Sequence, residues 1–419
     1  MAVRIGVEEE FHVLDIESGQ LVPRAGAVLG RLCLRPDFTT ELQRSAVEWN
    51  SRVHASLDSL HADLVKARLR LDAAASGLGL AVVAAGTVPL ARVTPGDATP
   101  DPRYRHMADA YRQVSDEHLV CSAQVHVDVT DRDTAVRIMC AVSPWLPPLL
   151  ALSASSPFWL GTDTGYASWR AMLWQRWPTS GPAGCFAGAD AYDATVTGLV
   201  RSGVISDPGM VYYDVRPSDH QRTLELRICD ACPRAETVVL VAGLFRALVE
   251  DARARLEEPA GRGVHCDGRH EWLRAADWRA ARAGLEGELV HPETRLAEPA
   301  AAVLRDMLRR LRPSLEAAGD WDAVRVLMDE ALARGSAAHR LRGVVEREGL
   351  LAGVATLVAE TRGERRPRPS STAARRPGPA LMAVHRTGTA AEASALAGGV
   401  KPSTARAVPA PPAPLWHGP

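Results

Sequence analysis

Several short segments of the chain alternate between apolar and polar residues, the pattern of a β-strand with one buried face. In the segment 122–129, three valines on one face alternate with Gln124, His126 and Asp128 on the other. In the segment 223–229, Leu and Ile residues alternate with polar ones that include Glu225 and Arg227. The pattern predicts strands at Val3–Phe11, Ala46–Asn50, Leu80–Gly86, Val120–Val129, Val211–Val215 and Thr223–Cys229.

Longer segments rich in Ala, Leu and Arg repeat their apolar residues at helical spacing, as in Leu57, Leu60, Leu64 and Leu71. The predicted helices are Leu57–Leu71, Asp133–Ser143, Ala235–Leu256, Arg274–Arg282, Ala301–Leu315, Trp321–Arg334 and Ala338–Glu348. Because the strands do not alternate one by one with these helices, the order of elements predicts an α+β fold with a largely antiparallel sheet packed with helices.

The composition of the chain changes near Gly363. The last segment, 363–419, has ten Pro and eight basic against two acidic residues, and it shows no helical or strand period. Such a composition is typical of a disordered extension. We therefore expect a folded domain at 1–362, followed by a disordered, basic, Pro- and Ala-rich tail at 363–419.

Charge and cysteine content exclude several broad classes. Lys+Arg is 49 against 50 Asp+Glu, which disfavours a general nucleic-acid binder. The sequence has no run of about 18 apolar residues, which a membrane helix would need. Its start, MAVRIGVEEEF, lacks the apolar region of a signal peptide. We therefore expect a cytoplasmic protein without membrane contact. Seven spread cysteines do not suggest a disulfide framework, and Cys229 and Cys232 are interpreted as buried thiols, with a zinc or redox pair as the alternative.

The polar faces of the predicted strands carry residues that can bind metal ions. Glu8 and Glu10 lie on one strand face about 6–7 Å apart, where like charges repel unless a cation lies between them. Glu48, His126 and Glu225 occupy equivalent polar positions on other strands. Oxygen ligands of this kind suit Mg²⁺ or Mn²⁺. The alternative is the solvated face of an amphipathic antiparallel sheet.

The chain has no glycine-rich phosphate-binding loop, and its only lysines are Lys66 and Lys401. Any nucleotide phosphates would have to be held by arginine and metal. Arg227 lies two residues after Glu225 on the same face, and its planar guanidinium suits phosphate or carboxylate. A cross-strand ion pair between Glu225 and its arginine neighbour is the alternative.

Several ordered motifs carry a resemblance to a known family. They are GVEEEF (6–11), SAVEWN (45–50), AAGTVP (84–89), VHVDV (125–129), LPPLLALSASSPFWLGTDTGYASWR (146–170), WPTSGP (177–182), YDVRPS (213–218), TLELRICD (223–230) and WRAARAGLEGELV (278–290). From about Gly6 to about Arg342, the sequence resembles the carboxylate–amine ligases labelled glutamate–cysteine ligase type 2. The resemblance implies a glutamine-synthetase-like fold whose curved antiparallel sheet binds Mg²⁺ beside ATP.

The same resemblance implies ATP-dependent amide formation through an acyl phosphate. The family default joins glutamate and L-cysteine into γ-glutamylcysteine, so a glutamate-like carboxylate and a cysteine-like amine are the expected small-molecule substrates. It implies metal binding by Glu8, Glu10, Glu48, His126 and Glu225, with Arg227 and Glu225 as catalytic residues. A homodimer is one oligomeric state that the sequence leaves open.

Four further arginines are candidate binding residues within the resembling region. Arg170 and Arg216 are candidates for a substrate carboxylate, against structural roles in their loops. Arg279 and Arg282 lie three residues apart on one predicted helix, and they either reach nucleotide phosphate or cover the surface.

The chain departs from the family pattern at Gln124, Asp128 and Val88, where relatives commonly have His, Gly and His. These departures leave the substrate pair open. The alternatives are the same chemistry on a different acid and amine in specialised metabolism, a catalytically lapsed ligand-binding member, and a metal-dependent amide hydrolase that consumes no ATP.

The composition of the tail generates a first prediction. Truncation after Arg362 should leave ligase activity and the thermal midpoint nearly unchanged, because an aperiodic Pro-rich segment buries little apolar surface. Activity assays and thermal melts of the truncated and full chains measure this. A large loss of either quantity would mean that the tail docks on the enzyme.

Overall fold

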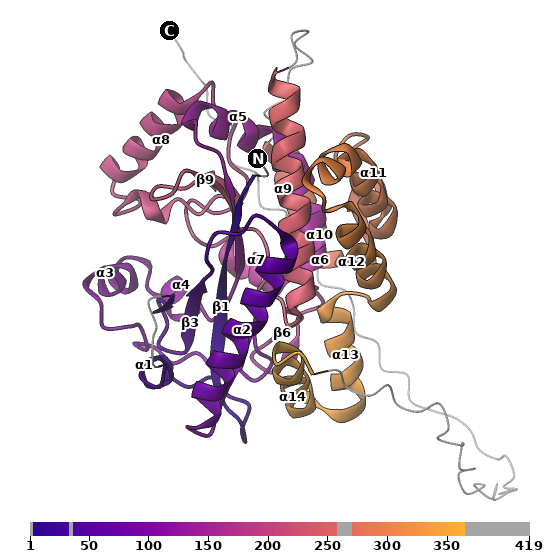
Figure 1. Cartoon of the computed structure of the whole chain (residues 1–419). Coiled ribbons are helices and arrows are strands. Elements are labelled where there is room, and N and C mark those ends of the chain that lie inside the picture. The colour runs from indigo at the N-terminus through magenta and orange to yellow at the C-terminus, as the bar shows by residue number, and fades with distance from the viewer. Residues whose placement is uncertain (1–2, 33–36, 258–269, 365–419) are drawn as a thin grey trace, which may run out of the picture. The chain divides into compact units, whose positions relative to one another are not determined.

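A computed structural model of the chain describes residues 3–32, 37–257 and 270–364, and the predicted tail lies almost entirely outside them. Its main feature is a seven-stranded sheet in the order β2–β3–β1–β5–β9–β8, with β4 also paired to β1 (Figure 1). The strands are β1 Ile5–Asp15, β2 Phe38–Thr40, β3 Ala46–Asn50, β4 Leu80–Val83, β5 Ala123–Asp128, β8 Val215–Pro217 and β9 Thr223–Leu226. Every pairing in this sheet is antiparallel, which confirms the predicted fold class.

The register of the sheet places polar residues of neighbouring strands directly opposite one another. Glu10 of β1 pairs with Glu48 of β3, and Glu8 pairs with Gln124 of β5. His126 of β5 pairs in turn with Glu225 of β9. Because opposite residues in a ladder share a face, these side chains form a row across the sheet.

One predicted strand is displaced along the chain. The segment Val211–Val215 was expected to be extended, whereas strand β8 covers Val215–Pro217 and a 3₁₀ turn covers Pro208–Met210. The Tyr212 N–H donates to Thr179 Oγ1 (3.1 Å) and the Asp214 N–H to the Gly181 carbonyl (2.9 Å). The backbone before β8 therefore bonds to another loop instead of a strand, which alternation in the sequence does not reveal.

Helices α2 (Leu57–Ser76) and α9 (Ala235–Glu257) cover the face of the sheet opposite the polar row. Their buried residues follow the helical period, with Leu57, Leu60, Leu64 and Leu71 of α2 in the main core. Ser56 caps α2 by accepting from the Ser59 N–H (3.3 Å), which satisfies one of the free donors of the first turn. Burial of each leucine contributes about 1.5–3 kcal/mol to stability.

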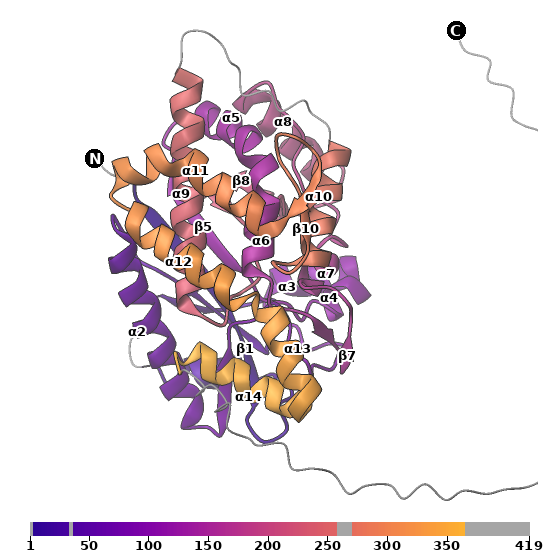
Figure 2. The same cartoon turned by 90° about the vertical axis from the view of Figure 1, so that its right-hand side faces the viewer.

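The remaining helices pack around the sheet and the two helices that cover it (Figures 1 and 2). Helices α11 and α12 pack on the outer side of α9, and α13 and α14 pack on each other and on the strand β4 side. The other helical bounds are α1 Ala25–Leu29, α3 Pro102–Tyr111, α4 Gln113–Asp116, α5 Arg132–Val142, α6 Leu146–Ser153, α7 Trp169–Trp174, α8 Ala189–Arg201, α10 His270–Ala283, α11 Ala300–Ala318, α12 Trp321–Arg334, α13 Ala337–Glu348 and α14 Leu350–Thr361. Two small hairpins, β6–β7 (Phe158–Trp159 and Thr162–Asp163) and β10–β11 (Glu288–Val290 and Ala297–Pro299), lie outside the main sheet.

One helical run has the length and composition of a membrane span. The run Arg132–Ser153, which comprises α5, a 3₁₀ turn and α6, passes that test, although no such stretch was expected. Within the protein, 78% of its most apolar window is buried, and α6 packs against α9 and α10. Its apolar character is therefore that of a core helix.

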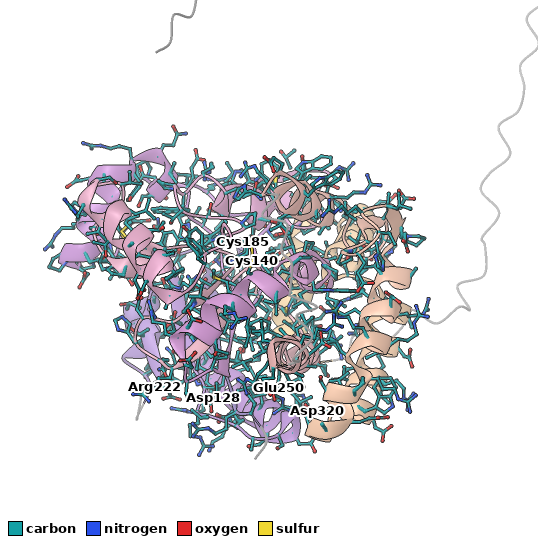
Figure 3. The ribbon with its side chains drawn as sticks, turned by 90° about the horizontal axis from the view of Figure 1, so that it is seen from above. Asp128, Cys140, Cys185, Arg222, Glu250 and Asp320 are labelled. Carbon is teal, nitrogen blue, oxygen red and sulfur yellow. A yellow bond between two sulfur atoms is a disulfide. The ribbon has the colours of Figure 1, made fainter. Side chains whose placement is uncertain are left out.

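The cysteines behave partly as expected. Cys229 and Cys232 are buried free thiols, in agreement with the interpretation from the sequence. No disulfide framework was expected, but Cys140 and Cys185 form a disulfide with their Cα atoms 5.7 Å apart (Figure 3). The fold brings α5 to the segment before α8, where the Ala189 N–H also donates to Asp133 (3.0 Å), and so places two distant cysteines together.

The middle glutamate of the Glu8–Glu10 run lies on the opposite face of β1 from its neighbours. Glu9 is fully buried, and Arg68 of α2 donates to both of its carboxylate oxygens at 2.5 and 3.1 Å. Arg68 also donates to the carbonyls of Cys232 (2.8 Å) and Pro233 (2.7 Å). This ion pair fixes β1, α2 and the segment after β9 to one another.

Loss of one partner from this buried pair should be severe. Arg68→Ala should lower the free energy of unfolding by about 3–5 kcal/mol, because the Glu9 carboxylate would stay buried without a counter-ion. Denaturant titration measures the change, with Lys66→Ala at an exposed position of the same helix as the control. Equal stabilities of the two variants would contradict the importance of the pair.

Candidate functional site

The polar row on the sheet contains two groups of side chains that could each bind a cation. Glu8, His126 and Glu225 form the first group, called here the histidine cluster. Glu10, Glu41 and Glu48 form the second, called here the carboxylate cluster. Within each group, one ligand atom from every residue lies within 4.8 Å of the others.

The histidine cluster is assembled from β1, β5 and β9. His126 Nε2 lies 3.2 Å from Glu8 Oε1, and its Nδ1 lies 2.9 Å from Thr223 Oγ1. Burial would lower the pKa of His126, but the carboxylates of Glu8 and Glu225 outweigh burial and raise it. The buried Nε2 makes no well-formed hydrogen bond, so it remains available to a ligand.

The negative charge of Glu225 is balanced by two arginines. Arg216 Nε donates to Glu225 Oε2 at 2.9 Å, and Arg227 Nη1 donates to Oε1. Burial alone would raise the pKa of Glu225, whereas Arg227, Arg216 and His126 together hold it well below its usual range. Glu225 is therefore a carboxylate at every pH at which the protein is expected to work.

The carboxylate cluster has the opposite electrostatics. Burial and the neighbouring Glu41 raise the pKa of Glu10 to about 7. Burial, Glu41 and Glu8 raise the pKa of Glu48 well above its ordinary value. These carboxylates crowd one another, and a divalent cation among them would relieve that repulsion.

Donors around the carboxylate cluster hold Glu10 in place. The backbone N–H and the hydroxyl of Ser122 donate to its two oxygens at 2.8 and 2.7 Å. Gln124 Nε2 donates to Glu10 Oε1 (3.1 Å), while Gln124 Oε1 accepts from Arg227 Nη1. Gln124, one of the departures from the family pattern, thus connects the two clusters.

The donor set fits divalent metal ions. One site would be formed by two carboxylates and an imidazole, and the other by three carboxylates, and such hard ligands suit Mg²⁺ or Mn²⁺. Burial and the neighbouring glutamates raise the pKa of Glu48, the direction expected where carboxylates crowd one another.

Arg227 lies one residue beyond the end of β9 but keeps the face predicted for it. Its guanidinium carbon lies 5.8 Å from the ring centroids of both Trp174 and Tyr212. Its Nε is buried without a hydrogen-bond acceptor. Arg227 thus borders the clusters with a donor that no described residue uses.

The two predicted carboxylate-binding arginines are occupied by protein groups. Arg170 is 1% exposed, and its two Nη atoms donate to the carbonyls of Ile228 (3.1 Å) and Arg227 (3.2 Å). Arg216 donates to Glu225 and to the carbonyls of Gly209 and Val211. These contacts favour roles in positioning Arg227 and Glu225, and substrate binding by Arg170 and Arg216 stays a prediction.

Arg279 and Arg282, the predicted nucleotide-binding residues, lie on α10. Arg279 forms an ion pair with Glu288 (2.5 Å) and also donates to its carbonyl (3.2 Å). Arg282 is exposed and stacks 5.7 Å from the centroid of Tyr166. No contact between either arginine and the two clusters occurs in the described part of the chain, so a nucleotide role remains untested.

Glu41 was missed by the sequence analysis. It follows the three-residue strand β2, which is too short to produce a recognisable alternation. A usable signal was its position seven residues before Glu48, since a tight return from β2 to β3 would bring the two together.

Comparison with known proteins shows the family of the chain. The family model described as glutamate-cysteine ligase family 2 (GCS2) matches residues 4–355. A protein of Frankia casuarinae named "Putative glutamate--cysteine ligase 2-2" is 54% identical over 361 residues, which cover 86% of this chain and 42% of that protein. A protein of Streptomyces coelicolor named "Putative glutamate--cysteine ligase 2" is 40% identical, with 83% and 95% covered. The chain spans less than half the length of the first three curated relatives.

Solved structures show the same fold. A glutamate–cysteine ligase of Francisella tularensis in complex with AMP superposes with a TM-score of 0.64 at 11% identity, covering 88% of this chain and 90% of that one. A bifunctional glutathione synthetase of Pasteurella multocida gives a TM-score of 0.62 at 16% identity, covering 86% and 52%. The fold class expected from the resemblance is confirmed.

The clusters generate a prediction about metal binding. Glu48→Gln should weaken Mg²⁺ binding at least tenfold, because a neutral amide oxygen replaces a carboxylate ligand. Calorimetric titration of nucleotide-free protein measures it, with Glu17→Gln at an exposed turn as the control. Unchanged Mg²⁺ affinity in Glu48→Gln would exclude the carboxylate cluster as a metal site.

Proposed function

Because the chain belongs to glutamate–cysteine ligase family 2, we propose that it is an ATP- and Mg²⁺-dependent carboxylate–amine ligase. The observation that carries this proposal is the pair of ligand clusters on one sheet face, bordered by Arg227. Carboxylates suited to metal ions and a guanidinium suited to phosphate meet where a phosphoryl group could be transferred.

The proposed reaction has two steps. A substrate carboxylate oxygen attacks the γ-phosphorus of ATP, the bond to the β,γ-bridging oxygen breaks, and ADP leaves. The amine then attacks the carbonyl carbon of the acyl phosphate, inorganic phosphate leaves, and the amine loses a proton as the amide forms. Bound Mg²⁺ would neutralise phosphate charge and orient the transferring group.

The residues of this chain serve positioning and electrostatic roles in the proposed reaction. Glu8, His126 and Glu225 would hold one metal ion, and Glu10, Glu41 and Glu48 another. Arg227 would donate to the phosphoryl oxygens as charge develops, supported by Glu225 and Gln124. No nucleophilic side chain is needed, because both nucleophiles belong to the substrates.

We propose glutamate as the acid and cysteine as the amine. Support comes from the names of the relatives, which assign this pair. The direct test incubates the protein with ATP, Mg²⁺, glutamate and cysteine, and measures ADP and the mass of the product. EDTA should abolish turnover and added Mg²⁺ restore it. Hydrolysis of γ-glutamylcysteine without ATP consumption would instead indicate a metal-dependent amide hydrolase.

The sharpest prediction concerns Arg227. Arg227→Lys should lower kcat at least a hundredfold, equivalent to about 3 kcal/mol of transition-state stabilisation, because lysine lacks the fork of donors. The KM for ATP should change much less, since the interaction strengthens as charge develops. Steady-state kinetics measures both constants.

Arg222→Lys, at an exposed position before β9, is the matched control and should keep full activity. If Arg227→Lys kept near-normal kcat and only lowered the thermal midpoint, Arg227 would be a structural partner of Glu225, and its catalytic role would be excluded.

A further inference from the structure

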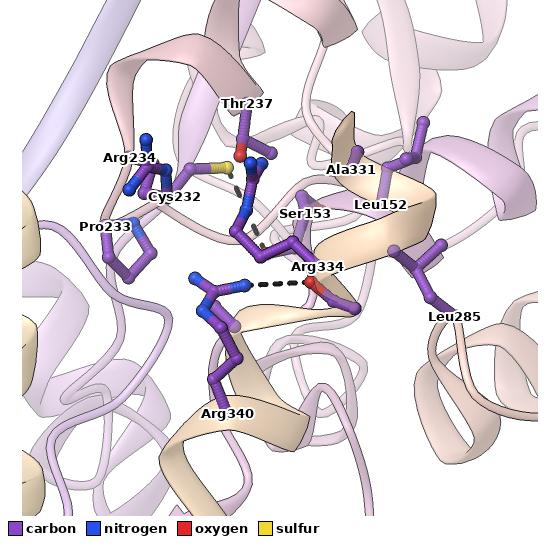
Figure 4. A pocket seen from close by; sticks show the side chains of 12 residues that line it. Leu152, Ser153, Cys232, Pro233, Arg234, Thr237, Leu285, Ala331, Arg334 and Arg340 are labelled. Carbon is purple, nitrogen blue, oxygen red and sulfur yellow. Dashed lines mark hydrogen bonds between the residues drawn. The ribbon is translucent and has the colours of Figure 1, made fainter. Parts of the chain in front are cut away.

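A pocket lies where four segments far apart in the sequence meet (Figure 4). It is bounded by the end of α6, the segment before α9, the loop after α10 at Leu285, and the junction of α12 and α13. Its lining includes Ser153, Cys232, Arg234, Thr237, Arg334 and Arg340. Three arginines from three different elements thus surround one small space.

The pocket lies behind the sheet, away from the two ligand clusters. Cys232 and Pro233 line it, and their carbonyls accept hydrogen bonds from Arg68, the partner of Glu9. Glu9 points to the face of β1 opposite that of Glu8 and Glu10, because neighbouring strand residues alternate. The pocket is therefore not part of the proposed reaction site.

Two of the three arginines have acidic partners. Arg234 Nη2 donates to Glu236 at 3.1 Å. Arg340 binds both oxygens of Glu360 at 3.1 and 2.8 Å and donates to the Gly335 carbonyl at 2.8 Å. Glu236 and Glu360 thus balance the charges of Arg234 and Arg340. The charge of the third arginine, Arg334, has no such partner of its own among the described residues.

The side chain of Arg334 makes no hydrogen bond and no ion pair with residues 3–32, 37–257 and 270–364. Its Nε is buried without an acceptor, and so is that of Arg234. Burial lowers the pKa of Arg334, and the charges of Arg234 and Arg340 lower it further, whereas Glu236 and Glu360 only partly offset them. The positive charge of Arg334 is therefore unfavourable for the folded protein unless an anion is bound.

The helices around the pocket add to its positive character. It lies at the first turns of α9, through Thr237, and of α13, through Ala337. Both helices have at least twelve residues, and the N-terminal end of a helix attracts anions. The Thr237, Ala338 and His339 N–H groups already donate within the protein, so the helix ends contribute positive potential and the arginines must supply the donors.

We propose that this pocket binds a small tetrahedral oxyanion, either inorganic phosphate or the phosphate group of a monoester. Guanidinium groups approaching from separate elements can each donate to a different oxygen of such an anion, which a planar carboxylate matches less well. The lining segment 232–234 follows β9, five to seven residues after Arg227, so an occupied pocket would also fix the chain that leads from the reaction site. This inference does not depend on the proposed ligase activity.

Equilibrium binding of inorganic phosphate to the full chain tests the proposal, at constant ionic strength and without nucleotide or metal. Arg334→Gln should weaken phosphate binding at least tenfold. Arg325→Gln, at an exposed position of the same helix, should leave it unchanged. Arg227→Gln should retain the Arg334-dependent binding, which separates the pocket from the reaction site. Tighter binding of glycerol 3-phosphate than of phosphate would identify a monoester as the source, and weaker binding would identify the free anion.

Stability provides an independent readout. In anion-free buffer, the thermal midpoint of Arg334→Gln should equal or exceed that of the unaltered protein, because an uncompensated charge is removed. A lower midpoint together with unchanged phosphate affinity would overturn the proposal and make Arg334 structural. If the variant did not fold, a crystal of the unaltered protein soaked in tungstate decides: density between Arg234 and Arg334 supports the site, and its absence there refutes it.

Discussion

The placement of three consecutive glutamates on the central strand β1 constrains the rest of the structure. Strand geometry sends Glu9 to one face and Glu8 and Glu10 to the other, so three like charges are separated by the sheet itself. Behind the sheet, where Glu9 is fully buried, its carboxylate is paired with Arg68. This buried pair keeps β1 in the register that presents Glu8 and Glu10 on the open face, since a slip by one residue would reverse all three.

On the face of the sheet that carries the polar row, two glutamates lie in opposite electrostatic environments. Glu225 is surrounded by Arg216, Arg227 and His126, so the protein itself stabilises its ionised form. Glu48 is surrounded by Glu41, Glu8 and Glu10, so the protein disfavours its ionised form. One side of the polar row thus has its counter-charges present, and the other side favours an added cation. Such adjacent and opposite environments are what the proposed phosphoryl transfer would require.

Much of this arrangement could be predicted from the sequence, because a strand periodicity of two fixes which side chains share a face. That rule placed Glu8, Glu10, Glu48, His126 and Glu225 on one face, and the structure brings them together. It could not find Glu41, whose strand is too short to show a period. Nor could it show that Arg170 and Arg216 are spent on backbone carbonyls, because those contacts depend on loops whose paths are set by tertiary packing.

The use of arginine explains why those loops hold their positions. With only two lysines in the chain, nearly every cation is a planar group with five donors that can bind a carboxylate and several carbonyls together. Arg68, Arg216 and Arg340 each do so and tie distant segments to the core. An arginine whose donors are fully used in this way supports the fold. The side-chain donors of Arg334 meet no acceptor among the described residues, although it lies in a pocket beside two other arginines, and the proposed anion would account for its presence.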